Sequence, residues 1–196
     1  MFANRFTAFV DACALAGALK RNLLLTLAEA EFFRIRWSEQ VLDETQKAIE
    51  SILAGKGVAD AAIRATRARR SMEAAFEEAM TADFDQYMCI CPDLPDTNDI
   101  HVVAAALKSQ AATIVTDNLK DFPTEMLDPL SIEVRSTDAF LADTISLDPG
   151  RAVAAIRRMR ERLKKPEKAG EALLLDMEAA GLTETVDALR SYVSFL

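Results

Sequence analysis

Short apolar runs of β-forming residues alternate with helical segments through the first two thirds of the chain. The runs are Phe6–Val10, Phe32–Trp37, Tyr87–Ile90, Thr113–Thr116 and Ile132–Arg135. The segments between them have the apolar spacing of helices. Four helices are predicted: Ala12–Leu27, one that starts after Ser38 and ends at Gly55 and Gly57, one over residues 58–80, and Asp99–Ser109. Strands that alternate with helices are typical of a parallel sheet covered on both faces. We therefore predict an α/β domain.

The pattern changes to helices alone from Thr137 onward. The predicted helices are Thr137–Ser146, Gly150–Lys164, Ala169–Ala180 and Thr183–Phe195, separated at Pro149, Pro166 and Gly181. We place a boundary near Ser136 and expect two parts, residues 1–136 and residues 137–196. The second part is either a helical cap on the first or a small bundle of its own.

Composition excludes several classes of protein. Apolar residues make up 51 % of the chain, which argues against disorder, and no apolar run reaches the roughly 18 residues that span a bilayer. The N-terminal segment is too short and mixed for a signal peptide. The single histidine excludes a multi-histidine metal site, and we interpret the three cysteines as reduced, buried residues. We predict a cytoplasmic protein without membrane contact.

The net charge of −8 is distributed unevenly. Acids far outnumber bases over residues 82–150, whereas residues 151–168 are strongly basic. A further basic run is formed by Arg64, Arg67, Arg69 and Arg70. An acidic centre between basic helices suits a protein that binds metal in one place and nucleic-acid phosphates in another. Solvated helix faces are the simpler explanation for either basic run alone.

Acidic residues follow the predicted strands. Asp11 comes directly after the first strand, Asp96 and Asp99 follow the third, and Asp117 follows the fourth. Glu44 lies early in the helix after the second strand. Because ligands of open α/β sheets bind outside the carboxyl ends of the strands, we expect these acids to lie close together.

Carboxylates gathered in this way need a cation. Two carboxylates about 4 Å apart repel by roughly 4 kcal/mol at an effective dielectric constant near 20. Hard oxygen ligands select Mg²⁺ or Mn²⁺, which activate water for attack at a phosphodiester. Each acid also has a simpler interpretation: Asp96 and Asp99 as helix caps, Glu44 as a surface residue and Asp117 as a turn residue. Asp11 is the most informative, because a carboxylate directly after an apolar strand is costly to bury without a partner.

Four stretches resemble the PIN-domain family, and in particular toxins of the VapC type. Phe9–Cys13 resembles the opening strand with its first metal-binding aspartate, and Ser38–Glu44 resembles the helix that supplies a glutamate. Asp96–Ala106 resembles the D-x-x-D motif followed by small apolar residues, and Ile114–Pro123 resembles the closing T-x-(D/N)-x-x-x-F motif. The likeness covers roughly residues 5–135, and residues 137–196 resemble the helical C-terminal extension of some of these toxins.

The resemblance implies a three-layer α/β/α sandwich with a parallel sheet of about five strands. It implies a Mg²⁺- or Mn²⁺-dependent endoribonuclease, the toxin of a bacterial toxin–antitoxin pair, with RNA as substrate, a cognate antitoxin as partner and frequent homodimerisation. Asp11, Glu44 and Asp99 would be catalytic. The metal site would draw on Asp11, Glu44, Asp96, Asp99, Asp117 and Asn118.

One departure from the family concerns the closing motif. Many members have an aspartate two residues after the threonine, where this chain has Asn118. Because neighbouring side chains at a strand end point in opposite directions, Asp117 and Asn118 cannot both face the ion. We predict that Asn118 occupies the aligned position, that Asp117 adds charge nearby, and that Thr116 hydrogen-bonds to a central carboxylate.

Two other interpretations stay open. The chain could be a catalytically silent PIN-like module that binds RNA or a protein, which the acidic surface and the neutral Asn118 favour. It could also be a receiver-type phosphate-handling protein. That family needs an acidic neighbour at Asp11 and a lysine after the fifth strand, and this sequence has neither.

Overall fold

The computed structural model describes residues 6–163 and 167–196 and divides them into two compact units. The first unit contains the described residues up to Gly17 together with Arg34–Arg135, and the second contains Ala18–Phe33 and the described part of Ser136–Leu196. The helical second unit therefore includes a segment from the N-terminal third of the chain. The division of the chain into domains at residue 136 stays a prediction.

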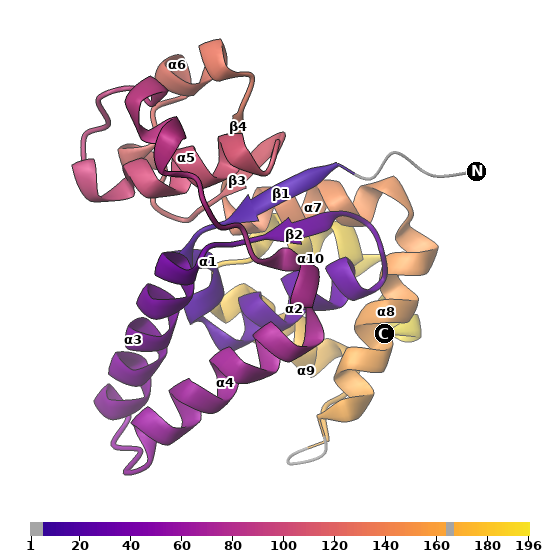
Figure 1. Cartoon of the computed structure of the whole chain (residues 1–196). Coiled ribbons are helices and arrows are strands. Elements are labelled where there is room, and N and C mark those ends of the chain that lie inside the picture. Colours follow the sequence, from indigo (N-terminus) through magenta and orange to yellow (C-terminus); the bar gives the residue numbers. More distant parts are fainter. Residues whose placement is uncertain (1–5, 164–166) are drawn as a thin grey trace. The chain divides into compact units, whose positions relative to one another are not determined.

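The first unit is built on a parallel sheet of four strands in the order β2-β1-β3-β4 (Figure 1). The strands are β1 (Thr7–Val10), β2 (Arg34–Arg36), β3 (Thr113–Val115) and β4 (Glu133–Arg135). Val10 pairs with Val115 in the parallel register of β1 and β3. Both residues are fully buried, as expected for a parallel sheet whose central strands are covered. The predicted α/β fold with a parallel sheet is confirmed.

One predicted strand is wrong. Tyr87–Ile90 belongs to a 3-10 helix, η2 (Asp85–Ile90), so the described residues form four strands and not about five. The Tyr87 N–H donates to the Phe84 carbonyl (2.8 Å), and the Cys91 N–H to the Met88 carbonyl (3.3 Å). Ile90 is 56 % exposed, whereas a strand inside the sheet would bury it. Short apolar runs do not distinguish strand from helix by periodicity, and the local hydrogen bonds decide here.

Helices and short 3-10 turns complete the first unit. The helices are α1 (Ala12–Ala16), α3 (Glu39–Gly55), α4 (Ala61–Ala75), α5 (Ile100–Lys108) and α6 (Thr124–Leu127). The further 3-10 turns are η1 (Glu77–Ala79), η3 (Thr97–Asp99), η4 (Leu119–Asp121) and η5 (Asp128–Leu130). α5 packs on β1 and β3 through a run of buried small apolar residues, Val102–Ala106. α3 and α4 lie side by side (Figure 1).

The predicted helix Ala12–Leu27 is two helices. Gly17 has an extended backbone (φ −74°, ψ 123°) and ends α1, and α2 (Ala18–Glu29) begins at the next residue. α1 belongs to the first unit and α2 to the second. Glycine weakens a helix interior because it loses the most conformational freedom on folding, so the break falls at Gly17.

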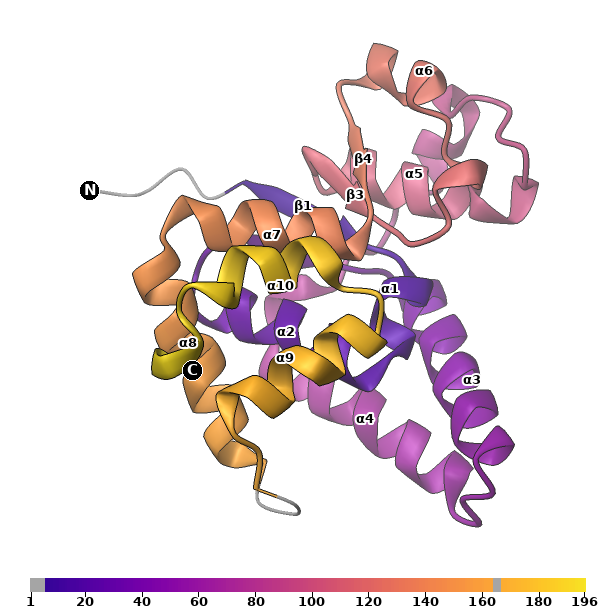
Figure 2. The same cartoon turned by 180° about the vertical axis from the view of Figure 1, so that it is seen from behind.

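The second unit consists of helices, in agreement with the pattern predicted after Thr137. Besides α2 it contains α7 (Thr137–Leu147), α8 (Pro149–Arg162), α9 (Gly170–Ala179), α10 (Thr183–Arg190) and η6 (Val193–Phe195) (Figure 2). α2 packs against α7 and α8, and α7 packs against α10. The rings of Phe33 and Phe140 meet edge to face, 4.8 Å apart. Among the described residues, no helix has the length and apolar character needed to cross a bilayer.

Candidate functional site

The candidate site lies where the strand order of the sheet reverses. From β1 the chain continues to β2 on one side, whereas β3 and β4 lie on the other side. The carboxyl ends of β1 and β3 are therefore neighbours, and the Asp11 N–H donates to the Val115 carbonyl (3.0 Å). Such a switch point is where open α/β sheets bind their ligands.

Asp11 is buried at this edge and firmly held. Its Oδ1 accepts from the Ala12 N–H (2.6 Å), so it caps α1, and its Oδ2 accepts from the Thr116 hydroxyl (2.8 Å). The Cys13 thiol also donates to Oδ2 (3.0 Å). Burial and the charge of Asp11 raise the pKa of Cys13 to about 12, so Cys13 stays a neutral thiol. These contacts fix the direction of the Asp11 carboxylate.

Hydrogen bonds in the turn after β3 connect Asp11, through Thr116 and Asn118, to Asp121. The Asn118 N–H donates to the Thr116 hydroxyl oxygen (3.1 Å), and the Asn118 side-chain amide donates to the Asp121 carboxylate. Asp117 is exposed, and its backbone N–H donates to the Cys13 sulfur (3.1 Å). Asn118 therefore orients a carboxylate, whereas the side chain of Asp117 lies outside the acidic group described next.

Three carboxylates form the centre of the site. Asp96, Asp99 and Asp121 each offer an oxygen, and these oxygens lie within 4.8 Å of one another. Asp96 caps η3, since its Oδ1 accepts from the Asn98 N–H (2.9 Å). Asp99 makes no capping hydrogen bond to α5, and its Oδ2 is buried without a hydrogen-bond partner among the described residues. Helix capping thus accounts for Asp96 but not for Asp99.

The electrostatics of Asp99 connect the three carboxylates to Asp11. Burial, together with the negative charges of Asp11, Asp96 and Asp121, raises the pKa of Asp99 to about 6. His101 acts in the opposite direction. Carboxylates that repel one another around a buried, unpaired oxygen are the donor set that a hard divalent cation satisfies. The residues present therefore fit a Mg²⁺ or Mn²⁺ ion.

Glu44 lies beside this group without being part of it. It is half-buried on α3, and its Oε1 is 3.3 Å from Nε2 of His101, which is 3 % exposed at the start of α5. Among the described residues, the acids close enough to share one ion are Asp96, Asp99 and Asp121. Of the predicted site residues, the structure thus brings Asp11, Asp96 and Asp99 together, with Thr116 and Asn118 as supports.

Asp121 belongs to the acidic group, although it was not among the predicted site residues. It lies in the same closing stretch as Asp117 and Asn118, for which we assumed that side chains alternate in direction as they do in a strand. The chain instead leaves β3 and forms η4, which places Asp121 next to Asn118. A signal was present, since Asp121 precedes the phenylalanine of the closing motif, Phe122, which is buried.

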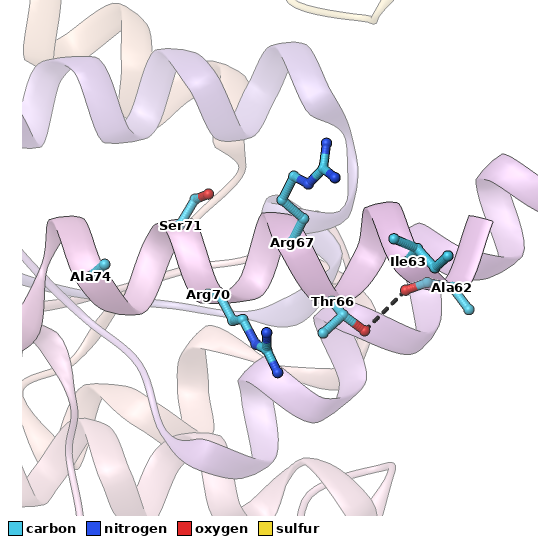
Figure 3. Close-up of a pocket in the computed structure, with 7 residues that line it drawn as sticks. All are labelled: Ala62, Ile63, Thr66, Arg67, Arg70, Ser71 and Ala74. Carbon is cyan, nitrogen blue, oxygen red and sulfur yellow. Dashed lines mark hydrogen bonds between the residues drawn. The ribbon is translucent and has the colours of Figure 1, made fainter. Parts of the chain in front are cut away.

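The four arginines of α4 have different surroundings. Arg69 binds the carboxylates of Glu39, Asp43 and Glu73, and its side chain is 15 % exposed. Arg64 pairs with Asp60 (2.9 Å). Arg67 and Arg70 are exposed and line a shallow pocket of about 550 Å³ on α4, where they point away from one another (Figure 3). Arg69 therefore fastens α4 to α3, and Arg67 and Arg70 are the more accessible cations.

The fold and the site define an α/β protein with a group of acidic residues at the switch point of a parallel sheet. Comparison with known families agrees: the chain belongs to the PIN-domain family, whose sequence profile matches residues 7–120. Residues 137–191 match the profile described as the VapC50 C-terminal domain. The resemblance found in the motifs, including the helical extension, is confirmed.

Among curated proteins, the chain is similar to one named "Putative ribonuclease VapC50" from Mycobacterium tuberculosis. The two are 47 % identical over 49 residues, which cover 25 % of this chain and 29 % of that relative. The similarity thus spans less than a third of the relative's length. No solved structure matches the chain significantly.

Proposed function

We propose that this protein is a metal-dependent endoribonuclease that acts as the toxin of a bacterial toxin–antitoxin pair. The observation that carries the proposal is the buried Oδ2 of Asp99, which no residue in the described part of the chain hydrogen-bonds and which lies among the charges of Asp11, Asp96 and Asp121. Membership of the PIN-domain family and similarity to a protein named as a ribonuclease support it. The expected metal is Mg²⁺ or Mn²⁺, and the expected place of action is the cytoplasm.

In this proposal Asp96, Asp99 and Asp121 hold the ion, and Asp11 and Glu44 assist from beside them. A bound divalent ion would supply a water of lowered pKa and would offset negative charge on the phosphoryl group under attack. The chain's own contribution is to hold the carboxylates in place before the ion arrives. Thr116 and the Ala12 N–H orient Asp11, and Asn118 orients Asp121.

Purified protein freed of any tag tests the proposal directly. We expect cleavage of a susceptible RNA with Mn²⁺, no cleavage with EDTA, and recovery when excess Mn²⁺ is added back. Hydrolysis with departure of a 3′ oxygen leaves 5′-phosphate and 3′-hydroxyl ends, which end-group analysis distinguishes from the cyclic phosphates of a metal-independent reaction. Cleavage that persists in EDTA would contradict the proposal.

We assign the phosphate contacts of RNA to Arg67 and Arg70. Both are exposed on α4, whereas Arg64 and Arg69 are ion-paired. Each phosphate contact to a single strand adds about 0.7 to the slope of log affinity against log salt, so the Arg67→Ala/Arg70→Ala variant should lower this slope by about 1.4. Arg64→Ala is the matched control from the same helix. If the slope of log affinity against log salt is equal in both variants, Arg67 and Arg70 do not contact the RNA phosphates.

The remaining partners follow from the family. We propose that a cognate antitoxin binds and inhibits the protein and that the chain forms a homodimer. Co-expression with the product of the neighbouring reading frame tests the first point. Light scattering tests the second.

A catalytically silent PIN-like module that binds RNA or protein is the second candidate. The net charge of −8 favours it, because an acidic surface disfavours a nucleic-acid substrate. It is supported if the wild type leaves RNA intact in Mn²⁺ while Asp11→Asn binds RNA equally well. Loss of Mn²⁺-dependent cleavage in Asp11→Asn excludes it.

A further inference from the structure

The single histidine of the chain occupies a position where a polar ring is costly. His101 is 3 % exposed in the first turn of α5, and the residues that follow it, Val102 and Val103, are fully buried. Neither ring nitrogen makes a hydrogen bond of good geometry with any described residue. Because a buried polar group without a partner is destabilising, a residue that only filled space here would be better apolar.

One carboxylate lies within reach of the ring. Nε2 of His101 is 3.3 Å from Oε1 of Glu44, a hydrogen-bonding distance, although the two groups are not well aligned. Hydrogen bonds at catalytic sites are often poorly aligned before the ligands bind. The Glu44 side chain is 38 % exposed, so without such a contact it would be free to turn toward solvent.

The same ring is close enough to the acidic group to act on the pKa of Asp99. His101 interacts electrostatically with Asp99, while Glu44 is absent from the set of oxygens that Asp96, Asp99 and Asp121 bring together. His101 therefore interacts with both Glu44 on α3 and Asp99 before α5, and it links the glutamate to the rest of the site.

We propose that His101 is a positioning residue: it donates its Nε2–H to the Glu44 carboxylate and holds that carboxylate beside the acidic group. This inference rests on the proposed function, because the acidic group that it serves is the proposed metal site. In this contact the proton is on Nε2. Groups that orient the ligands of a metal in this way usually change metal affinity or activity by 10–100-fold when they are removed.

Nuclear magnetic resonance of the metal-free protein tests the contact without reference to activity. The chain contains one histidine, so the imidazole ¹⁵N signals of tag-free protein in EDTA are unambiguous. At pH 8.5 we expect the tautomer with the proton on Nε2, and we expect Glu44→Ala to shift the Nε2 resonance. Glu50→Ala, an exposed acid on the same helix, is the control and should leave it unchanged. A proton on Nδ1, or equal spectra for all three proteins, would overturn the inference.

Calorimetric titration with Mn²⁺ tests the consequence. We expect His101→Leu to weaken Mn²⁺ binding about tenfold, and His101→Gln, which keeps an N–H donor near the position of Nε2, to recover most of it. Val103→Ala creates a cavity in the same helix and serves as the control, with Mn²⁺ affinity within about twofold of the wild type. If Val103→Ala weakens binding as much as His101→Leu, the effect of His101 is merely structural and the inference fails.

A double-mutant cycle distinguishes positioning of Glu44 from any other route. If His101 acts through Glu44, His101→Leu causes no further loss of Mn²⁺ affinity in the Glu44→Ala background. Independent, multiplying losses would overturn the inference and leave the proposed function intact. A wild-type protein that takes up no Mn²⁺ would instead overturn the proposed function, and the metal-free spectra would still decide whether the His101–Glu44 contact exists.

Discussion

Two aspartates, one in each unit, have opposite surroundings. Asp138, in the first turn of α7, is 8 % exposed and accepts from the backbone N–H groups of Glu184 (2.9 Å) and Thr185 (2.8 Å). The hydroxyls of Thr183 (3.3 Å) and Thr185 (2.7 Å) also donate to it. Asp99, in the sheet unit, has several negative neighbours and a buried oxygen to which none of the described residues donates a hydrogen bond.

The difference shows what each carboxylate contributes. Asp138 meets the N-terminus of α10, where free N–H groups and the helix dipole favour a negative charge. Its burial is compensated within the chain, so it stabilises the fold. Asp99 is surrounded by like charges, and its raised pKa records the cost. The described residues compensate the charge of Asp99 only in part, and a divalent cation would supply the remainder.

The largest expected effect concerns Asp99. The variant Asp99→Asn keeps the shape of the side chain but removes the charge that the ion requires. We expect Mn²⁺-dependent RNA cleavage to fall at least about a hundredfold, which corresponds to about 2.7 kcal/mol in the activation barrier. Initial rates with a susceptible RNA measure the loss, and the circular dichroism spectrum should not change.

Asp93→Asn is the control for Asp99→Asn, since Asp93 is an exposed acid shortly before the same motif. Its cleavage rate should equal that of the wild type. Full activity in Asp99→Asn would show that Asp99 is not needed for cleavage, and its contrast with Asp138 would then have no functional meaning.

The second expected effect concerns the stability of the helical unit. Asp138→Ala removes four hydrogen bonds to a buried charge and leaves the N–H groups of Glu184 and Thr185 without their partner. We expect the free energy of unfolding to fall by about 2 kcal/mol, measured by urea denaturation. Asp187→Ala removes an exposed acid from α10 and should cost less than about 0.5 kcal/mol. Equal midpoints for the two variants would show that the Asp138 contacts contribute nothing.

A third effect tests the residue that the sequence analysis missed. Asp121→Asn should weaken Mn²⁺ binding about tenfold, or about 1.4 kcal/mol, because it removes one of three converging carboxylates. Asp117→Asn should change the affinity by less than about twofold, because Asp117 is exposed and outside that group. Calorimetric titration compares them. If Asp117→Asn loses more Mn²⁺ affinity than Asp121→Asn, Asp117 is the acid nearer to the ion and Asp121 does not belong to the site.

The sequence predicts the elements that depend on local pattern. Asp11 was found because an apolar strand followed at once by an acid is unusual, and the strands around it are confirmed. Asp99 was found because its motif combines an acid with a helix of small apolar residues that packs on the sheet. In both cases one short stretch contains the strand or helix and the functional residue together.

The sequence fails where distant segments or short turns decide. Tyr87–Ile90 has the composition of a strand, but its local hydrogen bonds make it a 3-10 helix. Asp121 lies in the short 3-10 helix η4 after β3, and its closeness to Asp96 and Asp99 is a contact between separate segments of the chain. The contact of His101 with Glu44 joins two helices that are far apart in sequence, and no local pattern encodes their distance. The position of α2 in the helical unit likewise depends on packing against α7 and α8.

The smallest expected effect is thermal, and it joins stability to the metal. An ion that binds only the folded state at ten times its dissociation constant stabilises it by about 1.4 kcal/mol, which raises the melting temperature of a chain of this size by about 3–6 °C. We expect this rise in the wild type and in Asp93→Asn, and little rise in Asp99→Asn. In EDTA the order should invert: Asp99→Asn should melt above the wild type, because a neutral amide relieves the repulsion that Asp99 suffers from its neighbours. A wild-type melting temperature that is unchanged at millimolar Mn²⁺, together with an Asp99→Asn variant that is less stable in EDTA, would mean that Asp99 stabilises the fold as Asp138 does, and the contrast between the two aspartates would no longer hold.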